Sequence, residues 1–189
     1  MTTRLFFRTV MMMAMTAMVS MTFTACGGDD EKDTEVPVTA SDEVTVINPN
    51  AQPKSNFAFF VPFHDFSGTS ADVYAYMADK GMTADWEDMG YGGGWKSADE
   101  KIQVSYVFGP TSMTMVTIEY FWYDRQDYEY ILAQTQKVFN VKLERLENTE
   151  KNSWMWRGTV QMNGRNVTVN VWGLKNGAYS DMNISLIAG

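Results

Sequence analysis

Two neighbouring segments near the end of the chain, joined by Asn163-Gly164, constrain the fold more than any other feature of the sequence. Asn-Gly favours the type I′ turn that connects two antiparallel strands, because both central residues of that turn take a positive φ. The joined segments are residues 154–162 and 165–173, and valines alternate with polar residues in the second. Side chains with a period of two point to opposite faces of a sheet, so we expect one buried and one solvated face.

The strand pattern continues to the end of the chain. A turn at residues 175–177 leads into a last predicted strand, 179–187, in which Met182, Ile184 and Leu186 fall on one face. These alternating segments follow one another through short turns. They therefore indicate an antiparallel sheet.

Earlier in the chain, short β-rich runs alternate with breaks that contain glycine or proline. Strands are predicted at residues 102–108 and 112–123. The aromatic run at 57–61 predicts a first strand or a plug at the domain edge, and Phe139–Leu143 predicts a strand or a continued helix. The composition Tyr-Gly-Gly-Gly-Trp predicts a loop at residues 91–95.

Two helices are predicted between these strands. The first spans residues 71–81, where Thr69 or Ser70 can cap the beginning and Gly81 the end. The second spans roughly residues 125–138 and repeats apolar side chains along one side. The predicted fold class is therefore α+β, an antiparallel β-sheet with about two helices packed on it.

An internal duplication of helix and hairpin is a further hypothesis. At an offset of 54 residues, Tyr74 aligns with Tyr128, and the turn at 109–110 aligns with the turn at 163–164. Few aligned positions are identical. The alternative is that two unrelated α+β segments share a similar periodicity.

Length, composition and charge bound the class of protein. The chain has 189 residues, of which 45% are hydrophobic and 20% charged, which is typical of one globular domain with a sizeable core. The formal net charge is −8. Because nucleic-acid-binding surfaces carry clustered Lys and Arg, a nucleic-acid partner is not expected.

The first 25 residues have the layout of a secretory signal peptide. Arg4 and Arg8 precede an uncharged, apolar stretch, and the small residues Thr24 and Ala25 stand directly before Cys26, the only cysteine in the chain. The segment resembles bacterial lipoprotein signal peptides, in which small residues precede an invariant cysteine. The resemblance implies cleavage before Cys26 and acylation of that residue, with palmitate among the acyl chains. Two or three acyl chains anchor a protein stably in a membrane.

Residues 26–53 are predicted to form an acidic, flexible tether. Seven acidic residues stand between Cys26 and residue 50, opposed only by Lys32, and blocks of like charge remain solvated. The acidic run directly after Cys26 resembles the export signal of lipoproteins of the Bacteroidetes group. This resemblance implies an outer-membrane lipoprotein exposed at the cell surface, with a single α+β domain over residues 54–189.

The sequence contains no recognisable catalytic, metal-binding or nucleotide-binding motif. His64, the only histidine, adjoins Asp65, and this pair supports one hypothesis, a hydrolase with a histidine general base. A serine in a G-x-S-x-G elbow is missing from the sequence, and a zinc site needs three or four good ligands. We therefore predict that the protein is not an enzyme and has no metal ligands and no cofactor.

Aromatic residues are the one feature that favours ligand binding. They make up 14% of the chain, and exposed Trp and Tyr rings are surfaces against which sugars and proteins pack. The candidate ligand-binding residues are Tyr91, Trp95, Trp122, Trp156 and Trp172. The alternative is that these rings form a second core layer under helices that cover the sheet.

The predicted function is a non-catalytic binding module for a protein or glycan, held at the membrane through Cys26. A first alternative is a structural, accessory or inhibitor-like envelope domain, which would present a flat apolar sheet face or an open edge strand. A second alternative is the hydrolase centred on His64 and Asp65.

Overall fold

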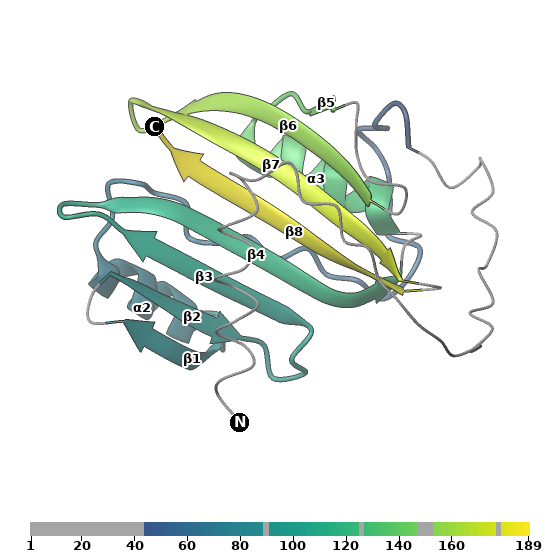
Figure 1. Ribbon diagram of the computed structural model, residues 1–189. Coiled ribbons are helices and arrows are strands. Elements are labelled where there is room, and N and C mark those ends of the chain that lie inside the picture. Colours follow the sequence, from purple (N-terminus) through teal and green to yellow (C-terminus); the bar gives the residue numbers. More distant parts are fainter. Residues whose placement is uncertain (1–43, 89–90, 125–126, 147–152, 177–178) are drawn as a thin grey trace, which may run out of the picture. The chain divides into compact units, whose positions relative to one another are not determined.

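The computed structural model describes residues 44–88, 91–124, 127–146, 153–176 and 179–189 (Figure 1). All of them fall in one compact unit of the chain. The helices and strands are α2 (Ser70–Asp79), β1 (Thr83–Asp88), β2 (Gly92–Lys96), β3 (Ile102–Phe108), β4 (Met113–Asp124), α3 (Tyr128–Phe139), β5 (Glu144–Arg145), β6 (Ser153–Met162), β7 (Arg165–Asn176) and β8 (Tyr179–Ala188).

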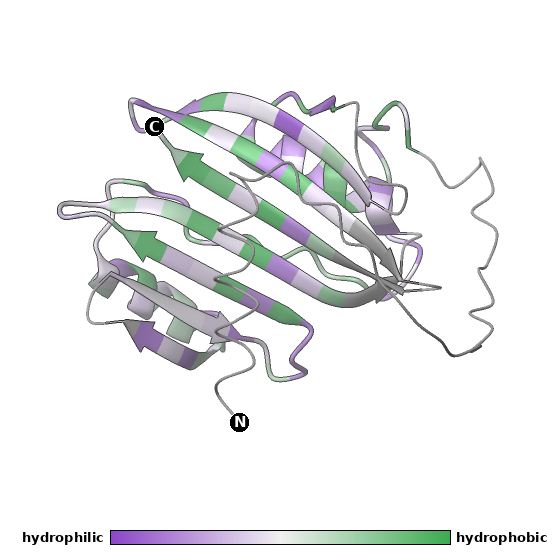
Figure 2. Ribbon diagram, in the orientation of Figure 1, coloured by the Kyte–Doolittle hydropathy of each residue, from purple (hydrophilic) through white to green (hydrophobic). Residues whose placement is uncertain are grey.

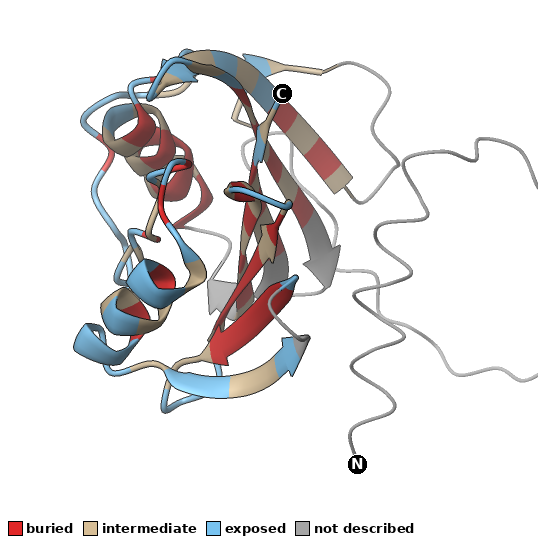
Figure 3. Ribbon diagram, turned by 90° about the vertical axis from the view of Figure 1, so that its left-hand side faces the viewer, coloured by how far each residue is buried: buried red, intermediate tan, exposed pale blue. Residues whose placement is uncertain are grey.

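The strands of this part of the chain form one eight-stranded sheet in the order β1-β2-β3-β4-β8-β7-β6-β5. Every neighbouring pair is antiparallel. Figure 3 views the sheet nearly edge-on and shows both helices on the same side of it. The predicted α+β class is confirmed: an antiparallel sheet carries two helices, which cover one of its faces.

The β6–β7 hairpin has the turn and the register that the sequence predicts. Asn163 and Gly164 both have a positive φ, 50° and 76°, as the type I′ turn requires. Figure 2 shows the alternation of hydrophobic and hydrophilic residues along the central strands. The residues fully or almost fully buried on the helix-covered side of β7 and β8 are Val167, Val169, Val171, Met182, Ile184 and Leu186.

The loop predicted at residues 91–95 is wrong, because Gly92–Lys96 forms strand β2 between β1 and β3. A Cβ added at Gly94 would overlap the indole ring of Trp86, and one added at Gly93 would lie 2.8 Å from the ring of Trp95. The glycines therefore leave room for two tryptophan rings, one on each side of the strand. Glycine usually weakens a strand unless another group approaches its backbone closely, which is the case in β2.

The aromatic run at 57–61 is irregular rather than a strand, and the chain stays irregular through Pro62 to Phe66. Tyrosines of the sheet hold it in place: the backbone N–H of Phe60 donates to Tyr120 Oη (3.1 Å), and that of Phe63 donates to Tyr106 Oη (2.9 Å). Phe66 itself is fully buried in the core. Of the two predictions, the plug agrees with the structure better than the strand.

Neither prediction for Phe139–Leu143 holds beyond its first residue. Helix α3 ends where Asn140 takes a left-handed conformation, with φ at 48°. The backbone N–H groups of Val141 and Leu143 then donate to the main-chain and side-chain oxygens of Gln136, at 3.1 and 2.9 Å. These bonds use donors that a strand would offer to its neighbour, so pairing with β6 begins only at β5.

Residues 44–53, predicted as the end of the tether, lie against the domain instead. Val44 and Ile47 pack on the core. The backbone N–H of Asn48 donates to the carboxylate of Glu129 in the first turn of α3 (3.1 Å). The apolar side chains in this otherwise polar stretch account for the contact. The described domain therefore begins before residue 54.

A buried carboxylate fixes the next part of the chain. Asp127 precedes α3 and is fully buried. Its Oδ1 accepts hydrogen bonds from the backbone N–H groups of Lys54 (2.6 Å) and Ser55 (3.2 Å), and the Ser55 hydroxyl donates to Oδ2. A buried charge is costly unless it has such partners. The cluster therefore ties the start of the predicted domain to the base of α3.

The structure does not confirm the helix–hairpin repeat at an offset of 54 residues. This offset aligns β4 with β7. In the sheet, however, β4 lies at the centre beside β8, and β7 lies one strand further out. What the element order does show is that each helix is followed by four strands, the last of which reaches the centre of the sheet.

Candidate functional site

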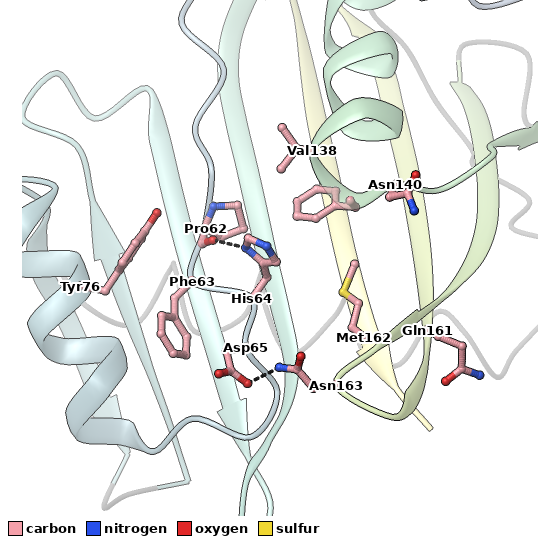
Figure 4. Close-up of a pocket in the computed structure, with 11 residues that line it drawn as sticks. Pro62, Phe63, His64, Asp65, Tyr76, Val138, Asn140, Gln161, Met162 and Asn163 are labelled. Atoms are coloured by element: carbon pink, nitrogen blue, oxygen red, sulfur yellow. Dashed lines mark hydrogen bonds between the residues drawn. The ribbon is translucent and has the colours of Figure 1, made fainter.

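A pocket with a volume of about 510 Å³ opens between the two helices. Four segments line it: residues 62–65, Tyr76 of α2, residues 138–140 at the end of α3, and residues 161–163 at the β6–β7 turn. Figure 4 shows these side chains arranged around His64, with residues 62–65 and Tyr76 on one side and those of α3 and the hairpin on the other. The fold thus brings together segments that are far apart in the sequence.

His64 is held by its own backbone and by an aromatic ring. Its Nδ1 lies 2.8 Å from the carbonyl oxygen of Pro62. A carbonyl only accepts hydrogen bonds, so Nδ1 carries the proton and Nε2 of the neutral ring is an acceptor. The ring meets Phe139 edge to face, with centroids 5.5 Å apart and planes at 84°. No described residue donates to Nε2, which leaves this atom available to a ligand.

Asp65 connects the loop below the pocket to the hairpin turn. Its Oδ1 accepts hydrogen bonds from the Ser67 backbone N–H (2.9 Å), from the Ser67 hydroxyl (2.6 Å) and from Asn163 Nδ2. The hydroxyl and backbone bonds from Ser67 lower the pKa of the Asp65 carboxyl, with a smaller contribution from Asn163. Asp65 is therefore a carboxylate at neutral pH and is held in one orientation.

Two asparagines of the pocket have a left-handed backbone conformation. Asn140 ends α3 with φ at 48°, and Asn163 begins the β6–β7 turn with φ at 50°. In the part of the chain that the structure describes, Glu100 is the one further non-glycine residue with a positive φ. Asparagine is the residue other than glycine that tolerates this conformation best. The backbone therefore accounts for an asparagine at each position, and a ligand would be a second reason.

Apolar rings form the remaining wall of the pocket. Tyr76 and Phe63 meet edge to face with centroids 5.7 Å apart. The Tyr76 hydroxyl donates to the carbonyl oxygen of Val61 (2.8 Å), and Lys80 Nζ lies 5.0 Å from the centre of its ring. Burial raises the pKa of the Tyr76 hydroxyl. None of the residues that line the pocket is Lys or Arg.

The arrangement lacks the series of groups that the hydrolase hypothesis requires. Nucleophilic catalysis needs a nucleophile bonded to a base, and the base bonded to an orienting group. No Ser, Thr or Cys lines the pocket, and Asp65 bonds to Ser67 and Asn163 rather than to the His64 ring. The described residues contain no group of three or more His, Cys, Asp or Glu side chains that could hold a metal ion.

The structure does not bring the five predicted aromatic residues together. Trp95 and Trp156 are each only 3% exposed, so the prediction that their rings contact a ligand is corrected: they belong to the core. Tyr91 is 68% exposed. Trp172 is half-buried in β7. The side chain of Trp122 lies outside the described part of the structure, although its backbone belongs to β4.

Contacts with other aromatic side chains explain why the two buried rings are core residues. Trp156 Nε1 donates to the hydroxyl of Tyr128 in α3 (2.6 Å). Trp95 packs edge to face against Tyr74 of α2 (5.0 Å) and Tyr106 of β3 (5.6 Å). Both rings therefore connect the sheet to a helix. This agrees with the alternative interpretation, a layer of aromatic side chains under the helices.

The opposite face of the sheet carries hydrogen-bonded polar side chains and half-buried tryptophans. Arg157 Nε donates to Asn170 Oδ1 (2.7 Å), and Asn183 Nδ2 lies 3.4 Å from Glu119 Oε1. Trp172 lies on this face, because its neighbour in β7, Val171, points into the core. The face is thus more polar than the flat apolar surface that the accessory-domain alternative predicts.

The sequence interpretation missed the pocket as a site. It assigned Asn163 to a turn only, and it gave no role to Asn140 or Tyr76. The one signal that could have found the pocket is the coincidence of a lone His-Asp pair with two asparagines at left-handed positions. That coincidence becomes visible only once the fold places residues 64, 140 and 163 side by side.

No protein-family model, curated protein or solved structure matches the chain. None of the described helices is long and apolar enough to cross a membrane.

Proposed function

We propose that the chain is a lipid-anchored envelope protein, exposed at the cell surface, whose domain binds a protein or glycan ligand without converting it. The observation that supports binding is the pocket around His64. It combines aromatic walls with side chains that can both donate and accept hydrogen bonds. Ligand sites commonly have this composition: a mostly apolar cavity with a few placed polar groups.

The anchor is proposed on the resemblance of residues 1–26 to lipoprotein signal peptides. Removal of residues 1–25 takes away Arg4 and Arg8 and leaves 13 basic against 23 acidic residues, a net charge of −10. Such a charge favours a protein that stays solvated above a membrane surface rather than one that adheres to it. Residues 26–43, the part of the proposed tether before Val44, lie outside the described residues.

The proposed lipid anchor and cell-surface location can be tested in a diderm bacterium that produces the full chain. Metabolic labelling with an alkyne analogue of palmitate is expected to label the wild type but not Cys26→Ser. Protease added to intact cells is expected to degrade the domain. A domain that is degraded only after the outer membrane is broken would place it in the periplasm. An unlabelled wild type would refute the anchor.

The accessory or inhibitor-like alternative would use a different surface, the sheet face that the helices leave uncovered (Figure 3), although this face is more polar than the flat apolar surface first expected. Half-buried Trp172 lies there among polar side chains, and such mixed surfaces occur in protein interfaces. A photo-crosslinking residue in place of Thr168 on this face should then capture a single envelope protein in living cells. The same probe in place of Ala71 of α2 should not. Equal capture at both positions would count against this alternative.

We also propose that the two halves of the domain are a duplication, each consisting of a helix and four strands. The support is the element order, in which β4 and β8 end the two series and pair at the centre of the sheet. Superposition of residues 70–124 on residues 128–188 in a crystal structure tests it. If the four strands of each half superpose but the two helices then occupy different positions relative to them, the duplication is contradicted.

A further inference from the structure

We infer that the pocket between α2 and α3 binds an uncharged, polyhydroxylated ring, such as a neutral sugar residue, and that the side-chain amides of Asn140 and Asn163 recognise its hydroxyl groups. This inference rests on the proposed binding function and specifies the ligand class. The charge of the pocket, its hydrogen-bonding groups and its apolar surface all favour such a ligand.

Charge disfavours an ionic ligand. The pocket is lined by one carboxylate, that of Asp65, and by no Lys or Arg. An anion would be repelled by Asp65 and would find no cation among the lining residues. A cation would be attracted by Asp65, but it would be repelled by Lys80, whose Nζ already lies 5.0 Å from the ring centre of Tyr76. A neutral ligand avoids both penalties.

The free polar atoms of the pocket match hydroxyl groups, each of which donates one hydrogen bond and accepts others. All three bonds to Asp65 reach Oδ1, so Oδ2 can accept from a ligand. Asn163 uses Nδ2 for one of these bonds and keeps its amide oxygen and a second N–H. Nε2 of His64 is an acceptor, and Asn140 offers a whole amide. Donors and acceptors are therefore both present around one cavity.

Apolar side chains supply the surface on which a sugar ring would pack. Phe63 and Tyr76 form one wall, and Met162 lies across the pocket from them (Figure 4). Phe139 also lines the pocket. The C–H faces of a sugar pack against such surfaces while its hydroxyl groups remain at the rim. A volume of about 510 Å³ lies within the range of roughly 300–1,000 Å³ usual for small-ligand sites. The pocket therefore has room for one or two sugar rings.

The backbone of the two asparagines makes a clean test possible. Because both have a positive φ, Asn140→Gly and Asn163→Gly remove the amide and keep a conformation that glycine adopts readily. If asparagine is present only for the backbone, each variant will bind as the wild type does. Glu100→Gly is the matched control, because Glu100 has the same kind of backbone, φ 58°, and does not line the pocket.

The only histidine of the chain is an ideal reporter, because it lies in the pocket and gives a single pair of imidazole C–H signals in an NMR spectrum. The full chain would be purified in detergent through a tag without histidine. It would be titrated with methyl glucoside, methyl galactoside, methyl N-acetylglucosaminide and cellobiose. Glucuronate, glucosamine and sorbitol would test negative charge, positive charge and an open chain.

We expect at least one neutral sugar to shift the His64 signal saturably and the three comparison compounds to shift it far less. Asn140→Gly and Asn163→Gly should each weaken that sugar roughly three- to tenfold, the effect of losing one or two hydrogen bonds. Glu100→Gly should bind as the wild type does. Thermal unfolding of each variant would show that it is folded.

Other outcomes overturn the inference. A shift caused only by glucuronate or only by glucosamine would refute the neutral ligand while the binding function stands. Equal affinity of wild type, Asn140→Gly and Asn163→Gly would refute the role of the amides. If no compound moves the signal, the sugar assignment fails. The proposed anchor and cell-surface location are tested separately by palmitate labelling and surface proteolysis. A failure of the sugar assignment can therefore be distinguished from a failure of the proposed anchor and location.

Discussion

The β6–β7 hairpin and the β1–β2 hairpin belong to one sheet, but different kinds of side chain cover the faces of their strands. In the middle of β7, the valines at 167, 169 and 171 are fully buried and alternate with polar residues, so the strand supplies its own part of the core. In β2, residues 92–94 are glycines, and the rings of Trp86 and Trp95 cover the backbone from both sides. The two hairpins show that a strand can be stabilised by side chains in regular alternation or by a few large rings that cover a backbone without side chains. Only the first way leaves a period of two in the sequence.

The largest expected effect comes from removing the ring that fills the inner side of β2. Trp95→Ala should lower the free energy of unfolding by about 4 kcal/mol, because a large buried aromatic side chain leaves a cavity. Val169→Ala, on the same face and fully buried, should cost roughly 2 kcal/mol, since it removes only two methyl groups. Urea denaturation followed by circular dichroism measures both. If both variants lose the same free energy of unfolding, the ring of Trp95 contributes no more to stability than one valine of β7, and the contrast between the two hairpins is wrong.

A second variant tests whether the glycines of β2 are required by the tryptophans. Gly94→Ala places a Cβ on the ring of Trp86 and should cost about 2 kcal/mol, as overpacking does. In a Trp86→Ala background the same change should cost little, because the clash has been removed. The four proteins form a double-mutant cycle measured by urea denaturation. Additive losses would show that Gly94 is needed for some other reason.

The comparison also shows how much of the fold the sequence could predict. The alternation in residues 165–173 and the Asn-Gly turn predicted a strand pair whose residues and buried face agree with the structure. The period of two failed in β2, because three consecutive glycines carry no side chains to alternate. The composition of the run 57–61 left a strand and a plug open, and its aromatic side chains pack against the core in an irregular conformation.

The site was less predictable than the fold, for a related reason. The five aromatic candidates were chosen by residue type, and type alone does not distinguish a ring in the core, such as Trp156, from an exposed one, such as Tyr91. The residues of the pocket come from four segments that only tertiary packing brings together. His64 and Asp65 were singled out for chemistry. The sequence could not show that Asn140 and Asn163 would be their neighbours.

A smaller effect is expected at the turn that makes the β6–β7 hairpin predictable. Asn163→Ala should cost about 1 kcal/mol, because alanine has a Cβ that disfavours its positive φ. Asn163→Gly should remain within about 0.5 kcal/mol of the wild type, since glycine accepts that conformation. Thermal unfolding of both variants checks the difference. If glycine costs as much as alanine, the amide contributes to stability through Asp65 rather than through the backbone.

The smallest expected effect is a pH dependence of stability. It arises from Asp65, which accepts hydrogen bonds from Ser67 in its own loop and from Asn163 of this hairpin. Hydrogen bonds from Ser67, and a weaker one from Asn163, lower the pKa of the Asp65 carboxyl below its ordinary 3.8. A carboxyl whose pKa is lowered by folding adds stability that is fully present above its unfolded pKa. That stability is lost as the pH falls through the lower folded pKa, where the folded protein also takes up the proton. In Asp65→Asn this contribution is missing at every pH.

The stability difference between wild type and Asp65→Asn should therefore be constant above about pH 5 and shrink as the pH falls to about 2. Hydrogen bonds from Thr69 and Ser97 likewise lower the pKa values of Asp72 and Asp99, so the wild type alone will lose more stability than Asp65 accounts for. Subtracting the variant at each pH removes those shared contributions. Because Asp65 is exposed to solvent, its effect will be small. A difference that stays constant down to pH 2 would show that these bonds do not favour the charged carboxylate, and that Asp65 holds the loop and the hairpin together by geometry alone.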